Sequence, residues 1–163
     1  DEGATAMGTV LKTKSTLSML DLECCGIRGN GCAALCNSLP EAALAVSLSE
    51  LSLSHNTIHV KCAEALGTML TVVTSLTKLN IMGCVGEKGC AAVCKGIANN
   101  SSLRELDLRG FRRNLQEGIH DVAKDAIVTV VVSNTCIIHI TNNFGLEERP
   151  VHEHRKRPCS MRA

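Results

Sequence analysis

Cysteine is the residue type in this 163-residue chain that could do the most chemistry, since there are ten cysteines. Two pairs have the four-residue spacing that places both side chains on one face of a helix, where they could bind a metal or form a redox pair. These pairs are Cys32 with Cys36 and Cys90 with Cys94. Structural zinc needs four ligands that converge in turns, whereas these two pairs belong to separate units of the chain. We therefore interpret them as small core residues, and metal binding is the disfavoured alternative.

Cysteine usage also bears on the compartment. Buried, reduced thiols in this number favour the cytoplasm, with a nuclear or cytoskeletal location left open, because disulfides are rare there. Exposed Cys24 and Cys159 near the C-terminus are the two thiols that we expect to oxidise first. Overlapping glycosylation sequons begin at Asn99 and Asn100, but the cysteine content argues against a secreted protein.

No catalytic constellation can be assembled from the other reactive residues. The histidines are scattered and none lies in a His-Glu-x-x-His motif: they are His55, His59, His120, His139, His152 and His154. The glycine-dotted stretch from Gly83 to Gly89 lacks the lysine and hydroxyl of a phosphate-binding loop. We therefore predict a protein that is not an enzyme and that holds no cofactor or metal.

The elements that position these residues follow from one pattern, Leu-x-x-Leu-x-Leu-x-x-Cys/Asn, which occurs five times. Its copies are Leu17, Leu20, Leu22, Cys25; Leu48, Leu51, Leu53, Asn56; Leu76, Leu79, Ile81, Cys84; Leu103, Leu106, Leu108, Phe111; and Thr135, Ile138, Ile140, Asn143. Apolar residues that alternate predict a strand with one buried face. Copies three to five depart from the ideal, so we expect irregular geometry there first.

Each strand is followed by a predicted helix. Large apolar residues recur four positions apart, which places both on the helix face toward the core. The pairs are Met7 and Leu11, Leu35 and Leu39, Leu66 and Leu70, Val93 and Ile97, and Ile127 and Val131. Alanine directly precedes each pair, and a small residue lies four positions before the first apolar residue of the pair, at Gly3, Gly31, Cys62, Gly89 and Ala123. Small side chains there would let each helix approach the strand layer closely.

The repeated strand and helix motifs resemble the ribonuclease-inhibitor type of leucine-rich repeat. The segments that carry the resemblance are 17–31 and 48–58 with their helices, and it extends over residues 1–146. This group includes Ran GTPase-activating proteins and the repeat domains of innate immune receptors. The resemblance implies an α/β solenoid: a right-handed β-α superhelix with a curved parallel sheet on its concave side and helices on its convex side.

The resulting domain prediction is a repeat domain at 1–146 followed by a basic tail at 147–163. Residues 1–16 are interpreted as a partial repeat, and complete repeats are predicted to start at residues 17, 48, 76, 103 and 135. Because the first residues match the middle of a repeat, we expect a fragment of a longer repeat domain. A net charge of +1 and the lack of a long apolar run argue against membrane partners, and against nucleic acid except through the tail.

The predicted concave surface is the candidate binding site. Residues that flank the buried leucines should point outward from it. They are Met19, Asp21, Glu23, Glu50, Ser52, Ser54, Lys78, Asn80, Met82, Glu105, Asp107, Arg109, His139 and Thr141. Five acidic and two basic residues among them give a charge near −3, which would attract a protein with a basic patch.

The sequence therefore predicts a non-enzymatic protein-protein interaction module that acts as a scaffold or regulatory surface. Three alternatives stay open: a Ran-type GTPase-activating protein, the sensor repeats of an innate immune receptor, and a structural component of a cytoskeletal or other large assembly. The oligomeric state is not predicted.

Overall fold

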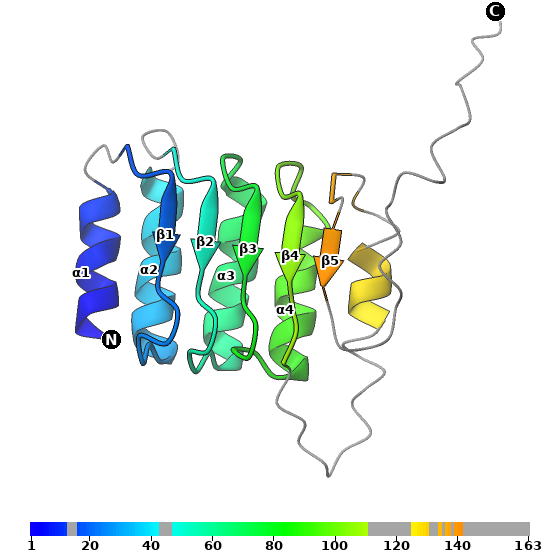
Figure 1. Cartoon of the computed structure of the whole chain (residues 1–163), viewed down its shortest axis with the longest axis horizontal. Coiled ribbons are helices and arrows are strands. Elements are labelled where there is room, and N and C mark those ends of the chain that lie inside the picture. The colour runs from blue at the N-terminus through cyan, green and yellow to red at the C-terminus, as the bar shows by residue number, and fades with distance from the viewer. Residues whose placement is uncertain are drawn as a thin grey trace, which may run out of the picture.

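The computed structural model describes residues 1–12, 16–42, 47–110, 125–130, 134, 136–137 and 139–141. Five parallel strands form one sheet in chain order, β1-β2-β3-β4-β5. Helices lie side by side on one face of this sheet, as Figure 1 shows. Strand and helix therefore alternate along the chain as the repeat pattern predicted, and the α/β fold class is confirmed.

Each strand is three residues long and is centred on an apolar residue of the pattern. The strands are β1 Met19–Asp21, β2 Glu50–Ser52, β3 Lys78–Asn80, β4 Glu105–Asp107 and β5 His139–Thr141. The parallel register aligns the central residues in one row: Leu20, Leu51, Leu79, Leu106 and Ile140. Because side chains alternate across a strand, this row faces the helices and the residues on either side of it face away.

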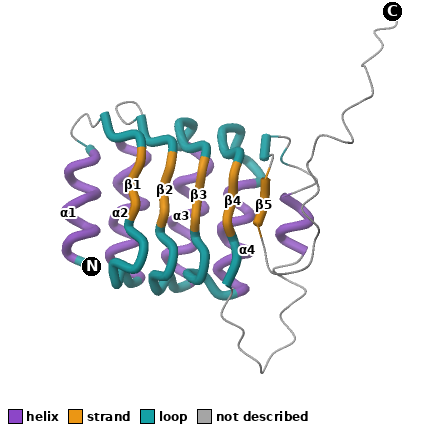
Figure 2. Tube along the Cα trace, in the orientation of Figure 1, coloured by secondary structure: helices purple, strands orange, loops and turns teal. Residues whose placement is uncertain are grey.

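The helices are α1 Glu2–Leu11, α2 Gly29–Ala42, α3 Val60–Val72 and α4 Glu87–Ile97. A short helical segment at 125–130 lies between β4 and β5 in the chain. Figure 2 shows the resulting arrangement, with the helices in one layer and the strands in the other. Both members of the predicted pairs in α2, α3 and α4 are buried, so the helical half of the pattern is confirmed there.

Small residues set the separation of α3 and α4. A Cβ atom built on Gly96 would overlap the Gly67 carbonyl oxygen, and one built on Gly67 would lie 2.5 Å from the Ala92 carbonyl oxygen. The two backbones thus touch directly, which only glycine allows. Gly89, one of the predicted small positions, likewise leaves 3.2 Å to the Ala63 Cβ atom.

Asparagine side chains join consecutive repeats inside the core. The Asn56 amide donates to the Leu22 carbonyl at 2.8 Å, and its Oδ1 atom accepts from the Ile27 amide at 2.9 Å. In the next copy Cys84 fills the same position, where Sγ donates to the Leu53 carbonyl at 2.6 Å. The asparagine or cysteine of the pattern therefore links its own repeat to the preceding one through hydrogen bonds to backbone groups.

The first copy departs from this scheme. Cys25 holds the asparagine position but is exposed, and Leu17 is also exposed. β1 is the edge strand of the described sheet, so no described strand lies on its other side to provide a carbonyl for Cys25 or to cover Leu17.

The fifth copy begins two residues later than predicted. We expected it to start at Thr135, with Ile140 matching Leu108, but Ile140 pairs with Leu106, so Ile137 matches Leu103. A two-residue shift keeps the alternation of the strand, so His139 and Thr141 stay in register with Glu105 and Asp107. Thr135, Ile138 and Asn143 lie outside the described residues, as do Phe111 and the predicted tail at 147–163.

Asn134 explains this register. Its Oδ1 atom accepts from the Cys136 and Ile137 amides at 2.8 and 3.2 Å. Asn100 makes the same pair of bonds in the preceding copy, to the Ser102 and Leu103 amides at 2.9 and 2.7 Å. Asn134 also donates to the Asn100 carbonyl at 2.7 Å, which ties the two copies together across 34 residues.

The cysteine prediction needs a correction. Cys32 of α2 and Cys62 of α3 form a disulfide with Cα atoms 6.0 Å apart, because the two positions face each other across adjacent helices. Cys36, Cys90 and Cys94 are buried thiols outside this disulfide, as expected for core residues. The argument for a reducing compartment therefore does not hold for the disulfide pair, and the compartment stays a prediction.

Candidate functional site

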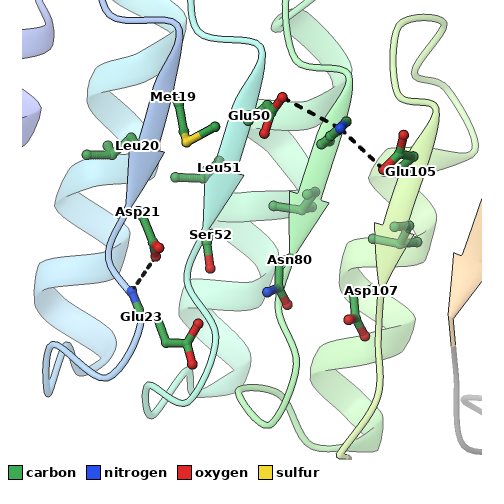
Figure 3. Close-up of a pocket in the computed structure, with 13 residues that line it drawn as sticks. Met19, Leu20, Asp21, Glu23, Glu50, Leu51, Ser52, Asn80, Glu105 and Asp107 are labelled. Atoms are coloured by element: carbon green, nitrogen blue, oxygen red, sulfur yellow. Dashed lines mark hydrogen bonds and ion pairs between the residues drawn. The ribbon is translucent and has the colours of Figure 1, made fainter.

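The face of the sheet that points away from the helices, called the strand face below, carries the candidate site. It is hollowed over about 400 Å³. Figure 3 shows the residues that line this hollow, which come from the first four strands and the turn after β1. They are Met19, Leu20, Asp21, Glu23, Glu50, Leu51, Ser52, Lys78, Leu79, Asn80, Glu105, Leu106 and Asp107.

The first position of each strand forms a row of exposed or half-buried side chains. The register places Met19, Glu50, Lys78 and Glu105 next to one another in that order. Lys78 Nζ lies 3.6 Å from a carboxylate oxygen of Glu50 and 3.6 Å from one of Glu105, as the dashed lines in Figure 3 show. Met19 is 56% exposed at the end of the row, which adds an apolar contact point beside the charges.

The last position of each strand forms a second row of short polar side chains, and these hold the following turns. Asp21 Oδ1 accepts from the Glu23 amide at 3.0 Å, Asn80 Oδ1 from the Met82 amide at 3.1 Å, and Asp107 Oδ1 from the Arg109 amide at 3.0 Å. Such bonds between a side chain and the backbone two residues later are typical of Asx turns. These residues therefore fix the shape of the strand face as well as its charge.

Beyond the strands lie Glu23, Ser54, Met82 and Arg109. The prediction that Ser54 points into solvent is wrong: it is fully buried, with its hydroxyl 3.4 Å from the Ser52 hydroxyl. Strand alternation stops at Ser52, so the turn that contains Ser54 follows a different geometry. Arg109 pairs with Asp107 through two nitrogens, at 2.7 Å from Nη2 to Oδ2 and 3.1 Å from Nε to Oδ1.

The charges of the strand face are unevenly distributed. Lys78 offsets one of its two glutamates, and Arg109 offsets Asp107. Within the described part of the chain, no ion pair involves Asp21 or Glu23, so the uncompensated acidity is greatest beside β1. The pairs are exposed and individually weak, which leaves the carboxylates able to exchange partners.

The structure thus brings together most of the predicted site residues. Nine of the twelve predicted residues from the first four copies line the hollow, whereas Met82 and Arg109 lie beyond the strands and Ser54 is buried. His139 and Thr141 lie on β5 beside Glu105 and Asp107, and only their backbone is described. Sequence reasoning missed that Asp21, Asn80 and Asp107 hold turns. The signal was available, because a short polar residue ends each of the first four strands.

Among the described residues, no three of His, Cys, Asp and Glu gather closely enough to hold a metal ion. Burial raises the pKa of Cys36 to about 12, and chiefly burial raises that of Cys84 to about 11, so neither thiol supplies a nucleophile at neutral pH. None of the described helices is long and apolar enough to cross a bilayer. A broad, shallow, charged face is suited to a polypeptide.

Comparison with known proteins agrees with this architecture. The family model described as "Leucine Rich repeat" matches residues 13–36. A solved structure, leiomodin-1 actin-binding site 2, superposes with a TM-score of 0.70 at 17% sequence identity and covers 85% of this chain and 78% of its own. The chain has a leucine-rich repeat fold. The finer assignment of these leucine-rich repeats to the ribonuclease-inhibitor type stays a prediction.

Proposed function

We propose that this leucine-rich repeat chain is a non-enzymatic protein-interaction module that binds its partner on the strand face. The observation that carries the proposal is the row of Met19, Glu50, Lys78 and Glu105, which presents charges and one exposed apolar side chain on the face that the helices leave open. Repeat solenoids commonly bind across such extended surfaces.

The partner is a polypeptide segment rich in arginine or lysine. The strand face combines five carboxylates with two cations, and an incoming guanidinium can contact carboxylates that now share Lys78. Arginine suits this role because its planar fork binds carboxylates through two bonds. Rim charges of this kind mainly raise the association rate, so binding should weaken as salt is added.

The experiment compares two variants that lose the same charge on opposite faces. Glu50→Gln with Glu105→Gln neutralises the strand face, and Glu2→Gln with Glu64→Gln neutralises exposed positions on α1 and α3. Proteins that the immobilised wild-type chain retains are quantified again on each immobilised variant. The dissociation constant of each purified partner is then measured for the wild-type chain and for both variants. We expect the strand-face variant to lose partners that the helix-face variant keeps. Equal retention on both variants would exclude the strand face as the binding site.

A structural role in a cytoskeletal assembly is a second candidate, motivated by the name of the structural neighbour, leiomodin-1 actin-binding site 2. Co-sedimentation with filamentous actin tests it, again with both variants. Sedimentation of the wild-type chain and the helix-face variant but not the strand-face variant would identify actin as the partner. A chain that stays in the supernatant would exclude this candidate and leave the interaction module standing.

A further inference from the structure

We propose that the strand face is also the docking site for the chain's own basic segment, residues 149–162, which competes with external partners. This inference rests on the proposed function, because it assumes that the strand face binds basic polypeptides. The segment contains five basic residues and one acidic residue, Glu153. The basic residues are Arg149, Arg155, Lys156, Arg157 and Arg162.

Charge complementarity is the first argument. The segment carries +4 (five minus one), and the strand face carries −3 from five carboxylates and two cations. The chain as a whole is nearly neutral at +1, so these opposite charges are a local pattern rather than a consequence of composition. Opposite potentials of this size attract within a Debye length, about 8 Å at physiological ionic strength.

The basic segment is also tethered closely enough to reach the strand face. The last described strand, β5, ends at Thr141, and seven residues separate it from Arg149. Seven residues span at most about 23 Å when extended. The sheet measures about 19 Å from β5 to β1, since neighbouring strands are about 4.8 Å apart. The segment can therefore reach every strand of the face, including the uncompensated Asp21 and Glu23 beside β1.

The spacing of the basic residues also fits. In an extended segment Arg155 and Arg157 point to the same side, about 7 Å apart. Glu50 and Glu105 are separated by two strand spacings, about 10 Å, and long arginine side chains can bridge the difference. Lys78, which now lies between the two glutamates at 3.6 Å from each, is 46% exposed and is free to move as the new cations arrive.

Docking within one chain has a measurable consequence. A segment tethered by a short linker has an effective concentration in the millimolar range, so even a weak contact occupies the face for much of the time. An external basic peptide must then compete. We expect its apparent affinity to be lower by about threefold to tenfold, and the difference to vanish at high salt.

The test uses the full chain in three forms: wild type, a tail-neutral variant with Arg155→Gln, Lys156→Gln and Arg157→Gln, and this variant with Glu50→Gln and Glu105→Gln added. The probe is a fluorescent peptide of residues 149–163 with Cys159→Ser. Its dissociation constant is measured by anisotropy at about 50 mM NaCl, chosen because screening is weak at this ionic strength. Among the described residues, Glu50→Gln and Glu105→Gln leave the hydrogen bonds of Asp21, Asn80 and Asp107 that hold the turns in place, and circular dichroism verifies that each form is folded.

Tighter binding to the tail-neutral variant than to the wild type, by about threefold or more and lost on adding the glutamate substitutions, would support docking. Equal affinity for both would overturn docking while leaving the strand face as a site for basic partners. Binding that persists after Glu50 and Glu105 are neutralised would place the peptide elsewhere and overturn docking. Failure of all three forms to bind would overturn docking together with the basic character of the proposed partner.

Discussion

Replacing Asn100 by alanine should cost the protein far more stability than replacing its neighbour Asn99. The Asn100 side chain donates to the Leu70 and Val73 carbonyls at 2.7 and 3.2 Å and accepts from the Ser102 and Leu103 amides. Asn100→Ala removes these four bonds, three of which are buried. At about 1 kcal/mol for each bond, the free energy of unfolding should fall by about 4 kcal/mol.

Asn99→Ala is the matched control, since Asn99 is exposed and, within the described part of the chain, its side chain donates one bond, to the Lys95 carbonyl at 3.2 Å. We expect it to change the free energy of unfolding by less than about 0.5 kcal/mol. Urea denaturation followed by circular dichroism measures both variants, and the slope with denaturant tests whether each still unfolds in one step. Equal losses for Asn99→Ala and Asn100→Ala, or a loss below about 1 kcal/mol for Asn100→Ala, would refute the view that this asparagine joins the repeats.

Four further predictions concern packing, turns and thiols. Gly96→Ala should destabilise the chain by about 2–3 kcal/mol because its Cβ atom meets the Gly67 carbonyl. Gly3→Ala is the control and should not destabilise the chain, because the space around Gly3 is open. Thermal unfolding measures the stability of both variants. Gly83→Ala, at φ +68°, should lower the free energy of unfolding by about 1–2 kcal/mol, whereas Gly86→Ala, at φ −81°, should lower it much less. Calorimetry that finds the same loss for both variants would contradict the backbone strain expected at Gly83. In the unfolded chain, thiols lose their protons near pH 9, whereas the raised pKa values keep Cys36 and Cys84 protonated in the folded chain. The free energy of unfolding should therefore fall from pH 9 upward by about 1 kcal/mol per pH unit for each thiol. Urea titrations at several pH values should show a shallower fall for a chain with Cys36→Ala. Reducing the Cys32–Cys62 disulfide, which spans 30 residues, should lower the free energy of unfolding by about 3–4 kcal/mol. A peptide map made without reductant should contain the linked pair, and a map that lacks this pair would contradict the disulfide.

The repeat pattern predicted the fold because equivalent positions have the same structural role in every copy. Leu20, Leu51, Leu79 and Leu106 occupy equivalent places in the sheet, so a period-two alternation was sufficient to assign strands and faces. The fifth copy was misplaced because its residues match the pattern in two registers, and the deciding contact is the bond from Asn134 to the Asn100 carbonyl. Such a contact depends on the neighbouring repeat, so the periodicity of a single copy does not reveal it.

The candidate site was predictable in outline for the same reason. Alternation identified Glu50, Lys78 and Glu105 as outward residues, and the structure adds that Lys78 bridges the two glutamates. Ser54 was misassigned because alternation was extended beyond the strand end. The disulfide was missed because Cys32 and Cys62 meet only when adjacent helices pack, a contact 30 residues apart in the chain.

The location of a bound basic peptide tests the central claim most directly. Amide chemical shifts of the labelled, tail-neutral chain are recorded as the peptide of residues 149–163 is added. The account predicts changes at β1 to β4 and at the turn residues Glu23 and Arg109, with little change along α2, α3 and α4. Changes confined to the helices, or no changes at peptide concentrations up to about 1 mM, where even weak contacts should be occupied, would contradict the assignment of the strand face as the binding surface.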